Sequence, residues 1–140
     1  GGFVRSLLGR KCRFDLWEPN LFVSARALPK EEAHLEYGDN IKRAYTYKAL
    51  NRLIQSSAAD QTKAAMAAVY KEKNKIPLVQ IHDELAFSVS GEKEARELCE
   101  IMESAYKLQV PSPSDISLGP NWGNLTKLDK SDSVPEIKDD

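Results

Sequence analysis

The sequence is poor in the residues that cross-link small proteins or bind metals through sulfur and nitrogen. Its 140 residues include only two cysteines, Cys12 and Cys99, and two histidines. The cysteines lie far apart and lack any paired ligand spacing, which excludes a disulfide framework and a zinc-finger site. We therefore expect two reduced thiols in a reducing compartment, and a cytoplasmic location.

Long apolar runs are missing as well. No run approaches the roughly 20 residues that span a bilayer, and no signal peptide is present, so we expect no membrane partner. The hydrophobic fraction of 41% and charged fraction of 29% are typical of a soluble globular protein of one domain. The chain begins with Gly1-Gly2 rather than Met, from which we expect a fragment or a processed piece.

Acidic residues are scarce in the first half of the chain. Residues 1–75 contain 14 Lys and Arg against 8 Asp and Glu, whereas residues 76–140 contain 6 against 13. This asymmetry fits a chain in which one segment touches phosphates and another holds cations or faces solvent.

Residues 76–90 carry the strongest local signal. Two apolar, β-branched runs flank His82-Asp83-Glu84, which predicts two strands joined by a tight turn. Adjacent carboxylates repel one another unless a cation lies between them, so the pair Asp83 and Glu84 indicates a divalent-metal site at the rim of a sheet. An ordinary solvated hairpin tip is the alternative interpretation.

A long helix is predicted from about Asn40 to Asn74, where Asn74 and Pro77 end it. Its apolar or small side chains recur at intervals of three and four residues and should face the core. They are Leu50, Leu53, Ile54, Ser57, Ala64 and Ala68.

A second helix is predicted over residues 92–108. Its apolar side chains should face inward, and its glutamates should form a solvated outer face. The inward set is Leu98, Ile101, Met102 and Ala105; the outward set is Glu94, Glu97, Glu100 and Glu103.

Polar side chains occupy the other face of the long helix. Four-residue spacing places Tyr47, Asn51 and Gln55 in one row, and Lys48 and Arg52 in the next. Asn and Gln amides can bond the acceptors of the DNA minor groove without reading sequence, while Lys and Arg meet phosphates. An exposed helix face without a ligand is the alternative.

The remaining segments predict a hairpin over residues 1–14, a connector over 15–40 with a short helix after Pro29, and a brief strand at 115–118. The polar residues 126–140 predict a disordered tail. The fold class is therefore α+β: a small antiparallel sheet, with the carboxylate-tipped hairpin, packed on one long and one medium helix.

Three blocks in order resemble the family A DNA polymerases, the DNA polymerase I type, and most of all their phage-encoded branch. They are Gly2–Arg10, which resembles the hairpin after the fingers; Ala49–Asp60, which resembles the palm helix; and Val79–Leu85, which resembles the metal-binding hairpin called motif C. Val110-Pro111 and Gly119–Trp122 are similar to the family's carboxyl terminus. The resemblance covers residues 1–125 and implies the carboxyl-terminal part of a polymerase palm.

The resemblance implies roles for the hairpin residues. Asp83 would ligate Mg²⁺ in a two-metal phosphoryl-transfer site, with Glu84 beside it as an auxiliary carboxylate. His82 would contact the primer terminus, although a packed hairpin histidine is the alternative. We thus count Asp83, Glu84 and His82 as candidate catalytic residues.

The resemblance also implies DNA contacts on the helix. Asn51 and Gln55 would follow the minor groove of the new duplex, and Arg10 would reach the template or primer backbone. Tyr47 stands where the family often has Arg, and the neighbouring Lys48 would supply that charge, with Arg52 on the phosphates alongside.

The family's other metal-binding Asp and its nucleotide-binding fingers helix would precede residue 1. We therefore expect an amino-terminal polymerase segment as a partner, with primer-template DNA and a deoxynucleoside triphosphate as substrates, in the host cytoplasm if the chain is phage-encoded. Alone, the chain should be inactive, because one carboxylate hairpin cannot bind two Mg²⁺ ions.

Two other functions stay open. The first is a DNA-binding or assembly fragment without catalytic activity. The second is a stand-alone metal-dependent phosphohydrolase that uses Asp83, Glu84 and His82; it would leave Asn51 and Gln55 without a role.

Overall fold

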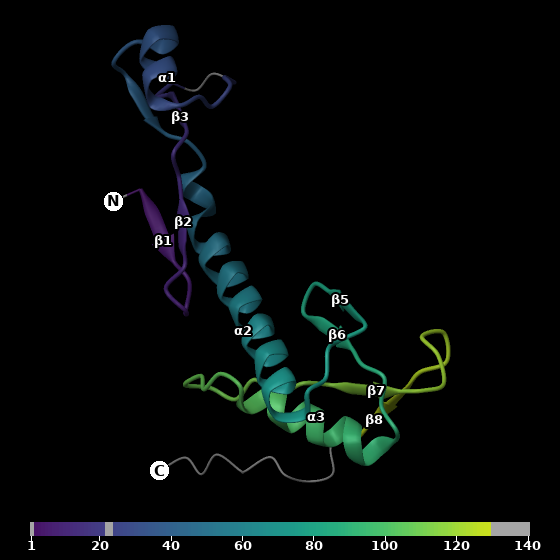
Figure 1. Ribbon diagram of the computed structural model, residues 1–140. Helices are drawn as coiled ribbons and strands as arrows, with labels where there is room; N and C mark the ends of the chain where they lie inside the picture. The colour runs from purple at the N-terminus through teal and green to yellow at the C-terminus, as the bar shows by residue number, and fades with distance from the viewer. Residues whose placement is uncertain (1, 22–23, 130–140) are drawn as a thin grey trace, which may run out of the picture. The chain divides into compact units, whose positions relative to one another are not determined.

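The computed structural model describes residues 2–21 and 24–129. The chain forms two compact units that divide after Gln61, within the long helix. The strands of the described residues form four separate two-stranded antiparallel sheets (Figure 1). The α+β class is thus confirmed, whereas the one small sheet that we expected is replaced, among the described residues, by four separate strand pairs.

The first unit begins with the predicted hairpin. Strands β1 (Phe3–Arg5) and β2 (Lys11–Arg13) pair antiparallel, with Val4 opposite Cys12. The alternation of the pleat leaves these two half-buried, while their neighbours along each strand are exposed. Gly9 has a φ of 83°, which a residue with a Cβ rarely adopts, and so closes the turn. The hairpin lies beside the first turns of α2 (Ala49–Lys73) in Figure 1.

A buried carboxylate fastens this hairpin to α2. Asp60 is 4% exposed, and its carboxylate accepts bonds from the guanidinium of Arg10 at 2.9 Å and the backbone N–H of Leu8 at 3.4 Å. The same guanidinium nitrogen donates to the carbonyl oxygen of Ser56, and the N–H of Leu7 donates to the hydroxyl of Ser57. The loop between β1 and β2 is therefore fixed at four points on one face of the helix.

The described residues between 15 and 44 form a small folded module rather than a simple connector. Strands β3 (Trp17–Pro19) and β4 (Ile41–Arg43) pair antiparallel, and α1 (Lys30–Tyr37) confirms the predicted short helix. The buried side chains of this module include Pro19, Leu28, Ala33 and Ala44, and Phe14 just before the module is buried as well.

The long helix begins later than we predicted. Ile41–Arg43 is a strand because it pairs with β3, and Tyr45 then adopts a left-handed φ of 61°, which a helix cannot continue through. A 3₁₀ turn, η1 (Thr46–Lys48), leads into α2 at Ala49. At its other end Asn74 has a φ of 51° and donates to the carbonyl of Tyr70, so the predicted stop is confirmed.

The apolar stripe predicted for α2 is wrong at Leu50 and Ile54, which are 67% and 60% exposed. Leu53 and Ser57 of the same stripe are half-buried, and the face that meets the hairpin carries Ser57 together with Ser56 and Asp60.

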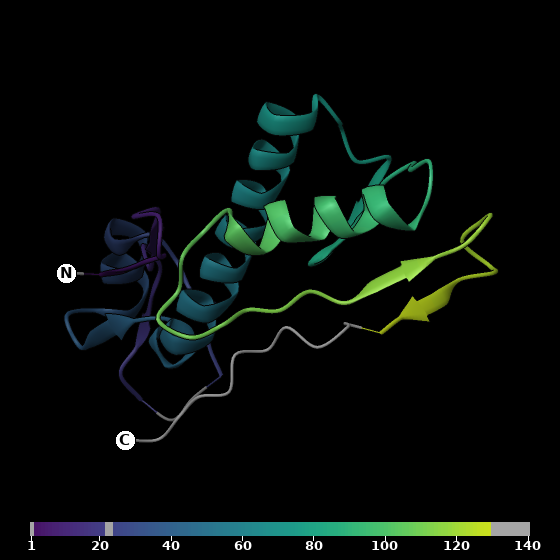
Figure 2. The same ribbon diagram turned by 90° about the horizontal axis from the view of Figure 1, so that it is seen from below.

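The second unit contains the apolar core. Val69 of α2 packs with Leu98 and Ile101 of α3 (Glu92–Ser104), and Ala68, Phe87, Val89 and Met102 surround them. The predicted inward face of α3 is confirmed for Leu98, Ile101 and Met102, although the helix ends at Ser104. Figure 2 shows α3 running across the second half of α2.

The acidic face of α3 is not simply solvated. Glu97 pairs with Lys73 at 2.7 Å, Glu94 pairs with Lys75 at 2.5 Å, and Glu103 accepts a bond from the backbone N–H of Ser114. The lysines belong to other elements, so the pattern of α3 alone could not reveal these pairs.

The predicted strand near residue 116 has a partner that we did not expect. Strands β7 (Ile116–Leu118) and β8 (Thr126–Leu128) pair antiparallel. The prediction of a disordered tail that starts at residue 126 is therefore wrong for the residues of β8. A Cβ at Gly119 would collide with the carbonyl oxygen of Asn124, so this tight return needs glycine. The rest of the predicted tail, residues 130–140, lies outside the described residues.

We predict that Asp60→Ala destabilises the chain by about 1–3 kcal/mol, since it leaves a backbone N–H and a guanidinium without their acceptor. Urea unfolding measures the change. Asp115→Ala is the control: Asp115 also pairs with a cation, but its side chain is 75% exposed, and we expect less than about 0.5 kcal/mol. Equal losses of stability in the two variants would contradict the role of the buried Asp60 carboxylate in holding the hairpin.

Candidate metal and nucleic-acid site

The turn of the carboxylate hairpin contains two residues, and not all three of His82-Asp83-Glu84. Strands β5 (Val79–Ile81) and β6 (Glu84–Ala86) pair with Ile81 opposite Glu84, so His82 and Asp83 alone make the turn. His82 has a φ of 54°, the positive value that the first position of a two-residue hairpin turn requires. A non-glycine residue adopts this conformation at a cost of about 1–2 kcal/mol. Such strain is common at functional sites.

The three hairpin side chains face solvent. His82, Asp83 and Glu84 are all exposed, and no described residue forms a hydrogen bond or an ion pair with them. The packed-histidine alternative is therefore wrong. The two carboxylates offer the hard oxygen ligands that Mg²⁺ prefers. Among the described residues, no group of three or more His, Cys, Asp or Glu could hold a metal ion.

The base of the hairpin is held firmly. Lys75, just before β5, donates at 2.6 Å to the carbonyl of Ser88, just after β6, and pairs with Glu94 of α3. Glu94 also accepts bonds from the N–H and the hydroxyl of Ser90. The Lys75 ammonium, followed by the two Ser90 donors, lowers the pKa of Glu94 from 4.5 to about 2. Both ends of the hairpin are thus anchored to one helix.

The first strand of this hairpin, and the residues just before it, leave apolar side chains exposed. Ile76 is 71% exposed, Leu78 70%, Val79 38% and Ile81 47%. Beyond β6, by contrast, Phe87 and Val89 pack on the core of this unit. The two-stranded sheet is therefore uncovered along β5.

Asn51 and Gln55 of α2 are exposed as predicted, but Tyr47 does not extend their row along the helix. Asn51 and Gln55 lie one turn apart on the outer face of α2 and face solvent. Tyr47 and Lys48 precede the helix in η1, so they do not continue this row. The Lys48 ammonium lies over the rings of Tyr45 and Tyr47, at 5.2 and 5.6 Å from the ring centres.

The two arginines assigned to the DNA backbone have protein partners. Arg52 lies over the ring of Phe14 at 4.9 Å and donates to the carbonyl of Arg13 at 3.4 Å. Arg10 binds Asp60 and the carbonyl of Ser56, with 45% of its side chain exposed. Both side chains therefore hold the β1–β2 hairpin against α2, and any contact with phosphate would come from their remaining nitrogens.

The hairpin and the amide pair belong to different units, the hairpin to the second and the amides to the first. Sequence reasoning missed the structural carboxylate Asp60, which the spacing of apolar residues could not reveal. It also assigned Leu50 and Ile54 to the core, although both are exposed beside Asn51.

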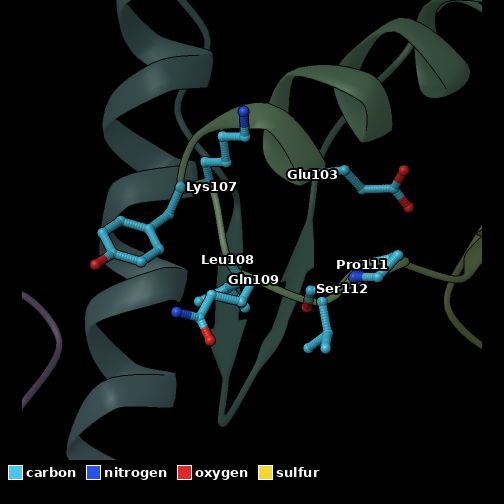
Figure 3. A pocket seen from close by; sticks show the side chains of 8 residues that line it. Glu103, Lys107, Leu108, Gln109, Pro111 and Ser112 are labelled. Atoms are coloured by element: carbon cyan, nitrogen blue, oxygen red, sulfur yellow. The ribbon is translucent and has the colours of Figure 1, made fainter.

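A hollow of about 290 Å³ beyond the end of α3 is a weaker candidate. Figure 3 shows the Lys107 ammonium and the Glu103 carboxylate pointing in different directions, so the polar groups do not converge on a ligand. Glu103 is engaged with the backbone of Ser114. This hollow therefore does not resemble a catalytic site.

Residues 1–124 match the sequence profile of DNA polymerase family A. The chain belongs to this family. The DNA-directed DNA polymerase of Pseudomonas phage M6 is 39% identical over 123 residues, which cover 88% of this chain and 15% of the phage protein. DNA polymerase I of Mycobacterium leprae (strain TN) is 44% identical over 130 residues, or 87% of this chain and 12% of that protein.

The thermostable DNA polymerase I of Thermus aquaticus is 30% identical over 127 residues, which cover 86% of this chain and 13% of that protein. The family A chain therefore spans a small part of the length of these relatives. Within its described residues, no helix has both the length and the apolar character that crossing a membrane needs.

We predict that substitutions of His82 rank by their tolerance of a positive φ. His82→Gly should be more stable than His82→Val by about 1–2 kcal/mol, since a β-branched residue is strained there and glycine is not. His82→Asn should fall between them. Urea unfolding of the three variants tests the order, and a valine variant as stable as the glycine variant would contradict the strained turn.

We predict that the stabilising effect of Glu94 depends on pH. Its carboxyl has a lowered pKa in the folded chain, so the stabilisation is present above about pH 4.5 and is lost as the pH falls to about 2. Thermal unfolding should therefore show Glu94→Gln less stable than the unsubstituted chain at pH 7, with a difference that shrinks across this range. Glu100→Gln, on an exposed position of the same helix, should show no such change. A constant Glu94 difference down to pH 2 would refute the pairing.

Proposed function

We propose that the chain takes part in template-directed DNA synthesis as the carboxyl-terminal palm portion of a family A polymerase. The observation that carries this proposal is the pair Asp83 and Glu84, presented to solvent at a two-residue turn without a described protein partner. Exposed, unneutralised neighbours of like charge favour an external cation. An amino-terminal polymerase segment would supply the second metal-binding Asp.

Asp83 would hold Mg²⁺, with Glu84 as the auxiliary carboxylate. When bound, two Mg²⁺ ions stabilise the attacking and leaving oxygens of an in-line phosphoryl transfer. Asp83 lies in the two-residue turn and is exposed, so a substrate phosphate could reach it from solvent. His82 would donate an imidazole N–H to the primer backbone, and the anchored base formed by Lys75 and Glu94 would keep the turn in place.

Asn51 and Gln55 would bind the minor groove of the primer-template duplex. Their exposure on one face of α2 supports this role, since each amide has both a donor and an acceptor free of the helix backbone. Lys48, with its ammonium beside two exposed tyrosine rings, and the free nitrogens of Arg10 and Arg52 would meet phosphates.

The uncovered side of β5 supports the need for a partner segment. A strand with exposed Val79 and Ile81 in a two-stranded sheet offers both apolar surface and unpaired backbone groups to another strand. We propose that the amino-terminal polymerase segment covers it.

The stand-alone phosphohydrolase has less support, because the described residues hold no cluster of three metal-binding side chains. A DNA-binding fragment without activity remains the competing function, and the same experiment separates it from the polymerase.

We predict primer extension by the chain only when an amino-terminal family A segment is supplied, in the presence of Mg²⁺ and deoxynucleoside triphosphates. Asp83→Asn should lower the extension rate by about a hundredfold or more, because it removes a charge that the transition state needs. Asp39→Asn, at a fully exposed carboxylate of the first unit, is the matched control and should extend normally.

DNA binding without extension in any such mixture would favour the inactive fragment. Normal extension by Asp83→Asn would contradict the metal site itself.

A further inference from the structure

The outer face of α2 carries an apolar stripe next to its amide pair. Leu50 and Ile54 are 67% and 60% exposed, one turn apart, and Ala58 continues the stripe with a small exposed side chain. At about 100° of helix rotation per residue, Leu50 and Ile54 lie about 40° apart, and Asn51 and Gln55 follow on the same side of the helix. Amides and apolar side chains thus form one continuous exposed strip.

Leu50 and Ile54 are exposed although the neighbouring side of this part of α2 is covered. That covered side includes Asp60, Ser57 and the carbonyl of Ser56, which bond to the β1–β2 hairpin. At about 100° of rotation per residue, Asp60 lies about 80° from Leu50, on the side away from Ile54 and the amides. Two large apolar side chains, which an amphipathic helix ordinarily buries, therefore face solvent where a ligand of the amides would lie.

The size of the minor groove determines what these side chains would meet. A helix with its side chains is about 10–12 Å across, while the minor groove of B-DNA is about 6 Å wide, so only the amides can enter. The residues beside them must then rest on the groove wall, which consists of sugar rings. In DNA this wall is largely C–H, whereas in RNA it displays 2′-hydroxyls.

We propose that Leu50 and Ile54 select duplexes whose sugars are deoxyribose. They pack on deoxyribose at the groove wall, and they bury a ribose 2′-hydroxyl without giving it a hydrogen-bond partner. This inference rests on the proposed function, because it requires the minor-groove contact of Asn51 and Gln55, and it adds a determinant of sugar specificity to that contact.

The test measures the Kd of the full chain for a DNA duplex and for the same duplex with one strand replaced by RNA, at one fixed ionic strength. A buried, unbonded hydroxyl weakens binding on the order of tenfold, so the chain should prefer the all-DNA duplex by about that factor. Leu50→Ser/Ile54→Ser should reduce the preference to about threefold or less, mainly through tighter binding of the hybrid. Both positions are exposed, and circular dichroism should show an unchanged helix content.

Leu35→Ser is the matched control, since Leu35 of α1 is 90% exposed and lies outside this strip. It should keep the preference of the unsubstituted chain. A third duplex, with 2′-fluoro sugars in place of ribose, separates the hydroxyl from groove shape, because it lacks the donor. It should bind like DNA; binding as weak as that of the RNA hybrid would overturn the proposal.

Equal affinity of the unsubstituted chain for both duplexes, or an unchanged preference in the double variant, would also overturn it. Asn51→Ala distinguishes this failure from failure of the proposed function. If Asn51→Ala weakens DNA binding while the double variant keeps its preference, only the sugar selection is wrong. If the chain binds no duplex at all, the minor-groove contact and the sugar selection are both wrong.

Discussion

The buried carboxylate of Asp60 determines which face of α2 is covered. A helix that packs on one side only must use either its apolar or its polar face, and the apolar effect ordinarily favours the first. Here the Arg10 guanidinium and the backbone N–H of Leu8 both bind Asp60, which commits the face with Ser56, Ser57 and Asp60 to the β1–β2 hairpin. The amides Asn51 and Gln55 remain exposed as a consequence, together with Leu50 and Ile54.

The second unit presents two like charges, those of Asp83 and Glu84, at a sharp turn. The left-handed His82 lets β5 and β6 join through two residues, so Asp83 lies at the tip rather than along a strand. The strain of that turn is tolerated because the hairpin's ends are tied to each other and to α3 through Lys75, Ser88 and Glu94. A rigid base and an exposed, strained tip suit a site that an external ligand completes.

Much of this arrangement could be predicted from local sequence. The β-branched runs around residues 79–86 encode the hairpin, and Asn74 with Pro77 encodes the end of α2, because each signal acts within a few residues. The strand Ile41–Arg43 could not be separated from the helix, since its conformation depends on β3, which lies far back in the chain. Periodicity assigned Leu50 and Ile54 of α2 to the core, which was wrong, because Asp60 binds an arginine far back in the chain and no local pattern reveals that pairing.

The exposed surfaces and the proposed metal site share one physical requirement. Apolar side chains on β5, and a carboxylate pair without a third ligand among the described residues, are each unfavourable or inert in isolation, and both would be relieved by a neighbouring strand that carried another carboxylate. The charge distribution agrees, since the acidic second half would repel DNA unless cations bound it, while the basic first half attracts phosphate directly. The proposed binding of DNA and of metal would place opposite demands on the charge of the chain, and a basic first half followed by an acidic second half would meet both.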